Sequence, residues 1–296
     1  MTDTTDTTCR CQALQGLFFR VAASGLMPAG WFRSPIPPEP DRKPGPDFPT
    51  LEIVSHCWRY AHLLAYQLSS LVLYPPSRLA VLVTVFHSDE DADTVALLRF
   101  IGSHAVPNVT WNWQVMPKEK LFRRSIGRNR AALTSRADWV WMTDCDIVFH
   151  AGCLDSAADA LRGRRDILVF PRTVLTTGLL DRTAPMLNKR PTPKLVDIDM
   201  TAFATHSRDR AKGPFQIVHG DVARAVGYCD GIRLYQSPAD YWCKCYEDRA
   251  FRWLMGTQGT PVEIVNACQI RHIEKGRYRR GSRMARIRSR IRRMQE

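Results

Sequence analysis

The amino-acid sequence predicts an α/β protein in which a mostly parallel central sheet carries helices on both faces. The main observation is an alternation, from about residue 51 onward, of short apolar runs with segments whose apolar residues recur at helical spacing. The second observation is the composition, with 45% hydrophobic and 24% charged residues in a chain of 296, which is typical of a globular protein with a sizeable core. Fibrous, collagen-like and wholly disordered chains are therefore excluded.

The N-terminal fifty residues predict an extension that does not join the sheet. Residues with helical spacing predict a short amphipathic helix, which either packs against the main domain or lies in a membrane interface. These residues are Leu14, Leu17, Phe18, Val21 and Ala22. Seven prolines follow between residues 34 and 50, and they exclude a helix or a central strand because proline fixes φ and lacks the backbone N–H. We interpret that stretch as a linker or an extended wrap.

The main domain alternates strands and helices. Apolar runs predict strands at residues 51–55, 79–86, 109–115, 139–142, 167–170, 215–218 and 262–265. Helical periodicity predicts helices at residues 60–73, 94–103, 120–135, 154–161 and 247–255. Residues 171–214 have weaker periodicity and predict a long variable stretch. The predicted organisation is an extension at 1–50, the α/β domain at 51–276 and a tail at 277–296.

The positive charge of the chain is concentrated at its end. The formal net charge is +13, and residues 271–296 alone hold eleven Lys or Arg against two Glu. Within the tail, Met284, Ile287, Ile291 and Met294 would form one stripe of a helix whose other faces carry arginines. This pattern favours a helix on an anionic membrane surface, with a solvated tail and nucleic-acid contact as alternatives. Nucleic acid is the less favoured partner because the tail has one aromatic residue, Tyr278.

Cysteine usage and the first residues favour a cytoplasmic protein, with peripheral attachment to the inner face of the membrane as an option. The chain has nine cysteines, an odd number, and begins with acids and threonines in place of a secretory signal. The longest apolar stretch, near residues 63–74, is interrupted by Gln67 and two serines and is too short to span a bilayer. The close pairs Cys9 with Cys11 and Cys243 with Cys245 lack the ligand spacing of structural zinc sites.

The most informative segment is residues 128–149, which read RNRAALTSRADWVWMTDCDIVF. A helix that carries Arg128 and Asn129 leads into an apolar strand, and the strand ends at Asp144 and Asp146. Two carboxylates at the end of a buried strand require a positive partner. Mg²⁺ or Mn²⁺ would fit, because these ions take one or two carboxylates together with substrate phosphates.

This segment resembles the DxD region of GT-A fold glycosyltransferases, and most closely glycosyltransferase family 2 and its relatives. The resemblance implies that Arg128 and Asn129 face a nucleotide sugar, that Asp144 contacts the ribose or the metal, and that Asp146 binds the metal. It also implies that His272, in RHIEKGR near the end of the domain, completes the metal site, which favours Mn²⁺ over Mg²⁺. Lys275 and Arg277 would then offset charge on the diphosphate.

Two further segments resemble the same family in order and spacing. The opening strand and turn, LEIVSHCWRYAH, place His56 where the family contacts the base, although the family often has asparagine there. The acid-rich loop FHSDEDADT follows the second strand and offers Asp89 or Asp91 for the nucleotide, of which Asp89 is preferred. Helix capping is the alternative explanation for acids at this position.

A third segment, residues 220–254, resembles the acceptor region of the family. Its Glu-Asp pair predicts Asp248 as the general base of an inverting transfer, with Glu247 positioning the acceptor. The alternative is that both acids only stabilise a helix N-terminus. Arg252 and Trp253 match part of the QxxRW box of processive relatives, but Arg249 stands in place of the glutamine, so processivity is not predicted.

The sequence thus predicts a metal-dependent glycosyltransferase. The donor would be a nucleotide sugar, with a UDP-sugar as first choice, and the acceptor a hydroxyl of a glycan or lipid-linked glycan. A nucleotidyltransferase with the same fold is the second choice, disfavoured because the turn after the first strand, SHCWRYAH, has no glycine. A non-enzymatic protein that binds an anionic surface is the third.

Overall fold

The computed structural model describes residues 16–181, 183–188, 192–240 and 246–273. Its larger sheet has seven strands in the spatial order β10-β6-β9-β4-β1-β2-β3. These strands are β1 (Thr50–His56), β2 (Ala80–His87), β3 (Val109–Val115), β4 (Trp139–Met142), β6 (Leu168–Pro171), β9 (Gln216–His219) and β10 (Thr260–Val262). Neighbouring strands are parallel except around β9, which runs antiparallel to β4 and β6. The predicted mostly parallel α/β sheet is therefore confirmed.

A second, four-stranded sheet has the order β5-β11-β7-β8. Its strands are β5 (Ile147–Phe149), β7 (Thr173–Thr177), β8 (Phe203–Ser207) and β11 (Ala267–Gln269). Strand β11 pairs in parallel with β7 and antiparallel with β5. Because β5 begins directly after the Asp-Cys-Asp loop that ends β4, this loop joins the two sheets.

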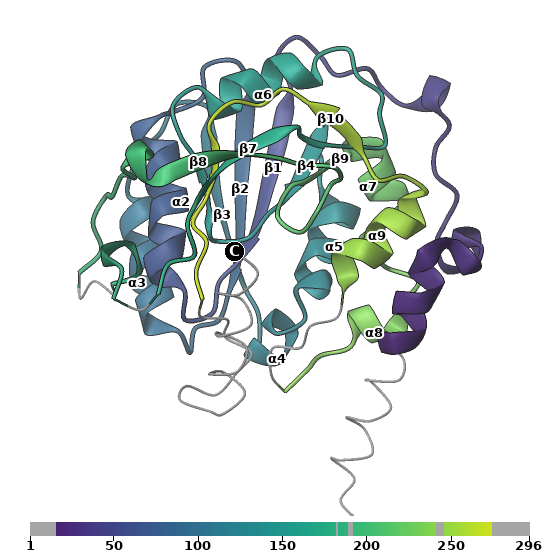
Figure 1. The fold of residues 1–296 in the computed structure, drawn as a ribbon, viewed down its shortest axis with the longest axis horizontal. Coiled ribbons are helices and arrows are strands. Elements are labelled where there is room, and N and C mark those ends of the chain that lie inside the picture. Colours follow the sequence, from purple (N-terminus) through teal and green to yellow (C-terminus); the bar gives the residue numbers. More distant parts are fainter. Residues whose placement is uncertain (1–15, 182, 189–191, 241–245, 274–296) are drawn as a thin grey trace, which may run out of the picture.

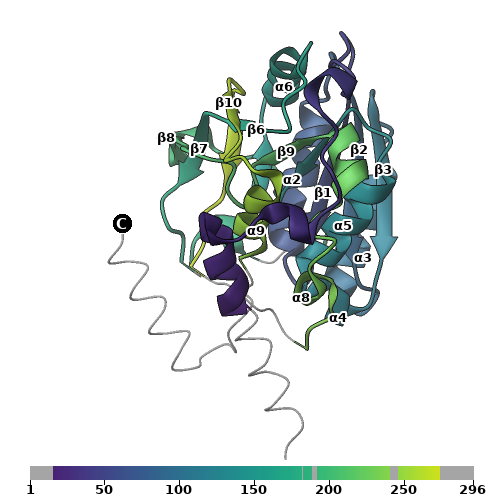
Figure 2. The same cartoon turned by 90° about the vertical axis from the view of Figure 1, so that its right-hand side faces the viewer.

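Helices cover both faces of the larger sheet (Figures 1 and 2). They are α2 (Ala61–Leu73), α3 (Ala92–Gly102), α4 (Lys118–Leu121), α5 (Arg124–Thr134), α6 (Cys153–Leu161), α7 (Gly220–Val226), α8 (Arg233–Gln236) and α9 (Glu247–Met255). Shorter helical turns are η1 (Ala22–Leu26), η2 (Ala29–Phe32), η3 (Glu39–Asp41), η4 (Pro185–Leu187) and η5 (Met200–Ala202). Residues 16–21 are also helical and continue into η1.

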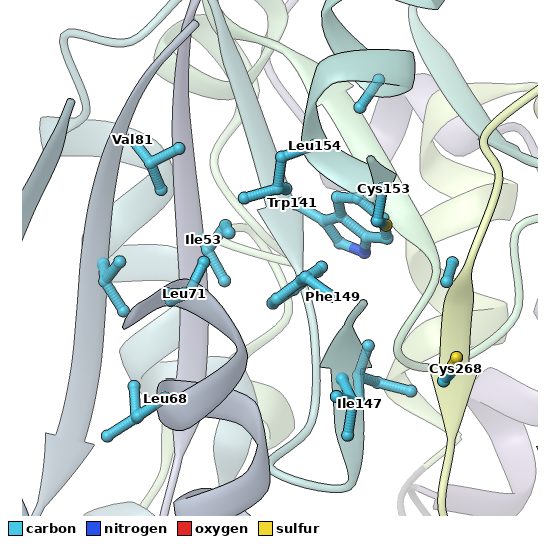
Figure 3. Close-up of a cluster of buried hydrophobic side chains, with 14 of the residues drawn as sticks. Ile53, Leu68, Leu71, Val81, Trp141, Ile147, Phe149, Cys153, Leu154 and Cys268 are labelled. Atoms are coloured by element: carbon cyan, nitrogen blue, oxygen red, sulfur yellow. The ribbon is translucent and has the colours of Figure 1, made fainter. Parts of the chain in front are cut away.

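Alternating side chains of the strands fill two separate cores. Ile53 and Trp141 point into the core shared with α2, α3, α6 and the second sheet, where Phe149 and Leu154 meet them (Figure 3). Val54, which follows Ile53 on β1, belongs to the other core, which the sheet forms with α5, α7 and α9. This division follows from the strand period of two, which sends successive side chains to opposite faces of a sheet. Strands β4 and β6 are buried on both faces, and they are accordingly apolar along their whole length.

Several elements differ from the sequence prediction. The helix expected at 120–135 is two helices, because the chain leaves helical geometry at Arg123 (φ −113°, ψ 81°). The strand expected at 262–265 ends at Val262, and Val265 is 52% exposed. Strands β7 and β8, in the stretch expected to be irregular, were missed; β8 is largely exposed and so lacks a strong apolar pattern.

The proline-rich stretch lies along the domain as an extended wrap. Gly45 N donates to Arg164 O at 3.1 Å, and Lys43 N donates to Asp221 Oδ2 at 2.8 Å. The described cysteines, Cys57, Cys145, Cys153, Cys229 and Cys268, are free and buried. In the described part of the chain, none of the helices combines the length and apolarity needed to cross a bilayer.

Candidate active site

The Asp-Cys-Asp loop lies at the carboxyl ends of β1 and β4, the edge of a parallel sheet where ligands bind. A fully buried amide on α2 fixes it: Gln67 Nε2 donates to Asp144 O at 2.9 Å and to Ile147 O at 3.1 Å. Ser55 Oγ in turn donates to Gln67 Oε1 at 2.6 Å. In the sequence Gln67 interrupts an apolar run, and this interruption was the signal for its role.

Two arginines and two carboxylates form the centre of the site, which we call the arginine cluster (Arg124, Arg128, Asp144 and Glu247). Arg124 Nη1 lies 2.5 Å from Asp144 Oδ1, and its Nη2 lies 3.0 Å from Glu247 Oε1. Arg128 Nη2 contacts the same Asp144 oxygen at 3.0 Å. The two arginines lie four residues apart on α5 and so share one helix face. Arg124 was not among the predicted site residues, although its spacing of four from Arg128, ahead of the acid loop, is a signal visible in the sequence.

The charges of this cluster are mutually compensated. Burial by itself would lower the pKa of Arg124, but the Asp144 and Glu247 carboxylates raise it well above its ordinary value. The pKa of Arg128 is also raised, against the effect of burial, by Tyr228 and Asp144. Both guanidinium groups therefore stay charged, and Arg124, whose side chain is 32% exposed, can hold an anionic group that reaches the loop.

Arg128 connects the loop to β9 and to the start of α9. Its guanidinium is buried and donates to Tyr228 Oη and Thr143 O, both at 3.1 Å. Tyr228 Oη donates to Gln216 Oε1 at 2.9 Å, and Gln216 Nε2 donates to Asp248 O at 3.1 Å. This chain of bonds fixes the start of α9 relative to Asp144. It makes Arg128 a positioning residue in the structure, while its predicted contact with a nucleotide sugar stays a prediction.

Asn129, the next residue on α5, binds the turn after α7. Its Oδ1 accepts from Tyr228 N at 2.8 Å, and its Nδ2 donates to Asp230 Oδ1 at 2.7 Å. These two bonds account for the presence of an amide at this position. The predicted approach of Asn129 to the nucleotide sugar stays a prediction.

His56 ends β1 next to the arginine cluster. Its ring stacks on Phe86, with centroids 5.0 Å apart and planes 24° apart, and neither ring nitrogen has a hydrogen-bond partner among the described residues. Burial, followed by the charges of Arg128 and Arg124, lowers the pKa of His56 well below its ordinary value, so the imidazole is neutral. The ring fits because α5 has Gly127 opposite it; a Cβ there would lie 2.1 Å from His56 Nε2.

The acid-rich loop after β2 divides its acids between two environments. Asp89 is exposed in the turn, and its predicted contact with the nucleotide stays a prediction. Asp91 is buried and accepts from Arg59 N at 2.5 Å and from Thr94 Oγ1 at 2.7 Å. Asp91 therefore joins the turn after β1 to the start of α3.

Asp146 lies on the other side of the loop, against the second sheet. Its backbone O accepts from Ile270 N at 2.9 Å, and its Oδ2 accepts from Gln269 Nε2 at 3.4 Å. Arg208 Nη2 donates to Gln269 Oε1 at 3.2 Å. We call Asp146, Gln269 and Arg208 the second-sheet cluster. Asp146 is 5% exposed, so its carboxylate is held at the junction of the two sheets.

His272 follows β11 on the same segment that binds Asp146. It is buried, and its backbone forms an isolated parallel β-bridge with Leu180. The centroid of its ring lies 5.5 Å from that of the Tyr60 ring. Among residues 16–273, leaving out the gaps in the description, no three His, Cys, Asp or Glu side chains form a group that could hold a metal ion. The trio Asp144, Asp146 and His272 stays a prediction. Its donor set suits an ion that takes its remaining ligands from substrate phosphates.

The two carboxylates of the Glu-Asp pair at the start of α9 lie in different surroundings. Glu247 is buried and joins the arginine cluster. Asp248 is 32% exposed; its Oδ2 accepts from Gly213 N at 3.3 Å and lies 3.5 Å from Arg252 Nη1. The structure therefore brings Glu247, and not Asp248, next to Asp144. Lys275, Arg277 and the tail at 277–296 lie outside the described residues.

Comparison with known proteins gives likeness to solved structures only. No family model matches the chain, and no curated protein matches it. It is similar to the mannosyltransferase PcManGT from Pyrobaculum calidifontis, solved in complex with GDP-Man and Mn²⁺, at 15% identity over 97% of this chain and 73% of that chain, with a TM-score of 0.44. It is also similar to S. aureus TarS 1–349, at 15% identity over 75% of this chain and 57% of that one, with a TM-score of 0.37.

Proposed function

We propose that the protein is a metal-dependent glycosyltransferase with a GT-A type site, which transfers a sugar from a nucleotide diphosphate to a hydroxyl acceptor with inversion. One observation carries the proposal: a single guanidinium, that of Arg124, joins Asp144 after β4 to Glu247 at the start of α9, at the carboxyl ends of parallel strands. A guanidinium fixed at this position would stabilise the negative charge that develops on a leaving diphosphate.

The donor would occupy the edge of the sheet between His56 and the Asp-Cys-Asp loop. The neutral ring of His56 would lie at the end of the donor that carries the base. Arg124 would bind a diphosphate oxygen, while Arg128 keeps Asp144 in place. Asp144, Asp146 and His272 would hold a Mn²⁺ or Mg²⁺ ion, which when bound offsets the charge of the leaving diphosphate.

The acceptor would approach from the start of α9. Its hydroxyl oxygen forms the new bond to the anomeric carbon while the bond to the diphosphate oxygen breaks, and the proton of that hydroxyl goes to the Asp248 carboxylate. Glu247 stays paired with Arg124 and positions the acceptor. The donor we propose first is a UDP-sugar and the acceptor a glycan or lipid-linked glycan. The protein would be cytoplasmic, with residues 277–296 in contact with an anionic membrane.

The proposal is tested by thermal unfolding with nucleoside diphosphates and their sugars, with and without Mn²⁺. Ligand at a hundredfold excess over its Kd adds about 2.7 kcal/mol to the free energy of unfolding. We expect one nucleoside diphosphate to stabilise the chain in a Mn²⁺-dependent way, and Arg124→Gln to lose that effect. Arg130→Gln, which changes an exposed arginine of the same helix, is the matched control. Stabilisation of wild type and Arg124→Gln alike, or none by any nucleotide, would contradict the proposal.

A further inference from the structure

Exposed apolar side chains are concentrated in one short segment at the start of the described chain. Ten large hydrophobic side chains are exposed among the described residues, and five of them lie between residues 17 and 31. They are Leu17 (56%), Phe18 (48%), Val21 (49%), Leu26 (75%) and Trp31 (72%). A concentration of this kind on a folded protein marks an interaction surface. We call residues 16–33 the docking segment.

The docking segment is fixed to the body by its other side chains. The Phe19 ring packs against Tyr235 at 6.0 Å, and the Phe32 ring packs against Trp253 of α9 at 5.4 Å. Trp253 Nε1 on α9 donates to Met27 O at 3.1 Å. The segment, drawn in purple, lies at the right-hand edge of the molecule in Figure 1 and faces the viewer in Figure 2, beside α9 in both views. Its exposed apolar residues are therefore presented outward by a held structure.

The charge of the segment favours an anionic partner. No acidic residue occurs from residue 16 to residue 38, whereas Arg20 and Arg33 are basic. The Arg20 guanidinium lies 5.0 Å from the centroid of the Tyr246 ring, directly before Glu247 in the chain. Phe, Leu and Trp together with arginine, and without acids, are typical of segments that lie in the interface of an anionic bilayer.

We propose that the docking segment attaches the protein to an anionic lipid surface by inserting Leu26, Trp31 and their exposed neighbours into the headgroup region. This proposal does not depend on the proposed function, and it is distinct from the expected contact of the tail at 277–296. Because the segment packs against α9, attachment would hold the start of that helix, and with it Glu247, close to the lipid surface.

The test is co-flotation of the full-length chain with vesicles of phosphatidylcholine and phosphatidylglycerol. At about 0.5 M salt the charge contribution of the tail is screened, so apolar insertion remains. We expect the double variant Leu26→Ser/Trp31→Ser to lower vesicle partitioning at least ~10-fold. The reason is that each apolar side chain that leaves water for the lipid increases the partition coefficient strongly. The matched control is Phe48→Ser/Leu73→Ser, which removes one aromatic and one leucine that are 49% and 40% exposed elsewhere.

The outcomes separate this surface from the alternatives. Retained partitioning of the control and of Trp31→Phe, with loss in the double variant, supports the proposal. Absence of wild-type flotation, or equal flotation of wild type and the double variant, overturns it. So does a wild-type dimer by light scattering that the double variant converts to a monomer without vesicles present, because the segment would then be a self-association surface.

Discussion

Asp144 and Asp146 lie two residues apart in one loop, yet they belong to clusters of opposite character. Asp144 is in the arginine cluster, where two guanidinium groups contact one of its carboxylate oxygens. Asp146 is in the second-sheet cluster, where an uncharged amide, that of Gln269, donates to it. The loop lies between the two sheets and turns at Cys145 and Asp146. The two carboxylates therefore do not share the common face that residues two apart have in an extended strand.

The difference indicates a division of work between the two acids. The charge of Asp144 is used to hold Arg124 and Arg128, and thereby the start of α9. Asp146 lies outside the arginine cluster, on the side of the second sheet, and it is the acid that the family resemblance predicts as a metal ligand. We therefore expect Asp144 to matter more for stability and Asp146 more for a divalent ion.

The largest effect is expected for Asp146→Asn, which keeps the size of the side chain and removes its charge. Mn²⁺-dependent donor affinity should fall by at least ~100-fold, because even residues that only support metal ligands contribute 10-fold to 100-fold. Isothermal titration with Mn²⁺ and the nucleotide found in the thermal panel measures it. Unchanged Mn²⁺ dependence would show that the metal role is assigned to the wrong acid.

Next in size is the effect of Asp248→Asn on turnover. The proposed loss of general base catalysis should lower turnover by ~10² or more while donor affinity stays nearly constant. Glu247→Gln is the informative partner variant, because it removes the charge that pairs with Arg124. If Glu247→Gln lowers turnover and Asp248→Asn does not, the base is the carboxylate that lies in the arginine cluster. A product of retained anomeric configuration would reject the inverting mechanism.

Asp144→Asn should reduce the free energy of unfolding by about 2 kcal/mol, below the 3–5 kcal/mol typical of breaking a fully buried pair. The discount is made because the Asp144 side chain is 25% exposed, whereas that of Arg128 is 1% exposed. Urea denaturation of Asp144→Asn and Asp146→Asn side by side measures the difference. Equal destabilisation of the two variants would remove the distinction between the clusters.

The smallest effect concerns pH and the arginine side of the loop. Burial and the two arginines lower the pKa of His56 well below its ordinary value of 6.5. Below about pH 6.5 the unfolded chain therefore binds a proton at His56 that the native protein does not bind. The stability contribution is thus present above that pH and is lost as pH falls from 7 to 5. His56→Gln should flatten this dependence by at most ~1.4 kcal/mol per pH unit.

The control for this measurement is His206→Gln, since His206 is exposed on β8. Burial also lowers the pKa of His87 and His219, so part of the pH dependence should survive in His56→Gln. An unchanged slope in His56→Gln would mean that the imidazole is not held neutral by the arginine cluster.

The sequence by itself determined the alternation of strands and helices from β1 to β4. Apolar runs and helical periodicity are local properties, so a strand such as β4 (139–142), which is buried and apolar along its whole length, could be recognised without knowing its neighbours. The Asp-Cys-Asp loop was identified for the same reason, because acids that follow a buried strand are anomalous in the sequence alone.

Only the tertiary structure decided which of these residues meet. Arg124 and Glu247 are 123 residues apart, and nothing local to either residue indicates the other. The second sheet was missed because β11 has three residues and β8 is mostly exposed, so their pairing supplies the structure that their patterns lack. The separation of Asp144 from Asp146 likewise depends on which element packs on each side of the loop, a property that arises from long-range packing and not from the order of residues.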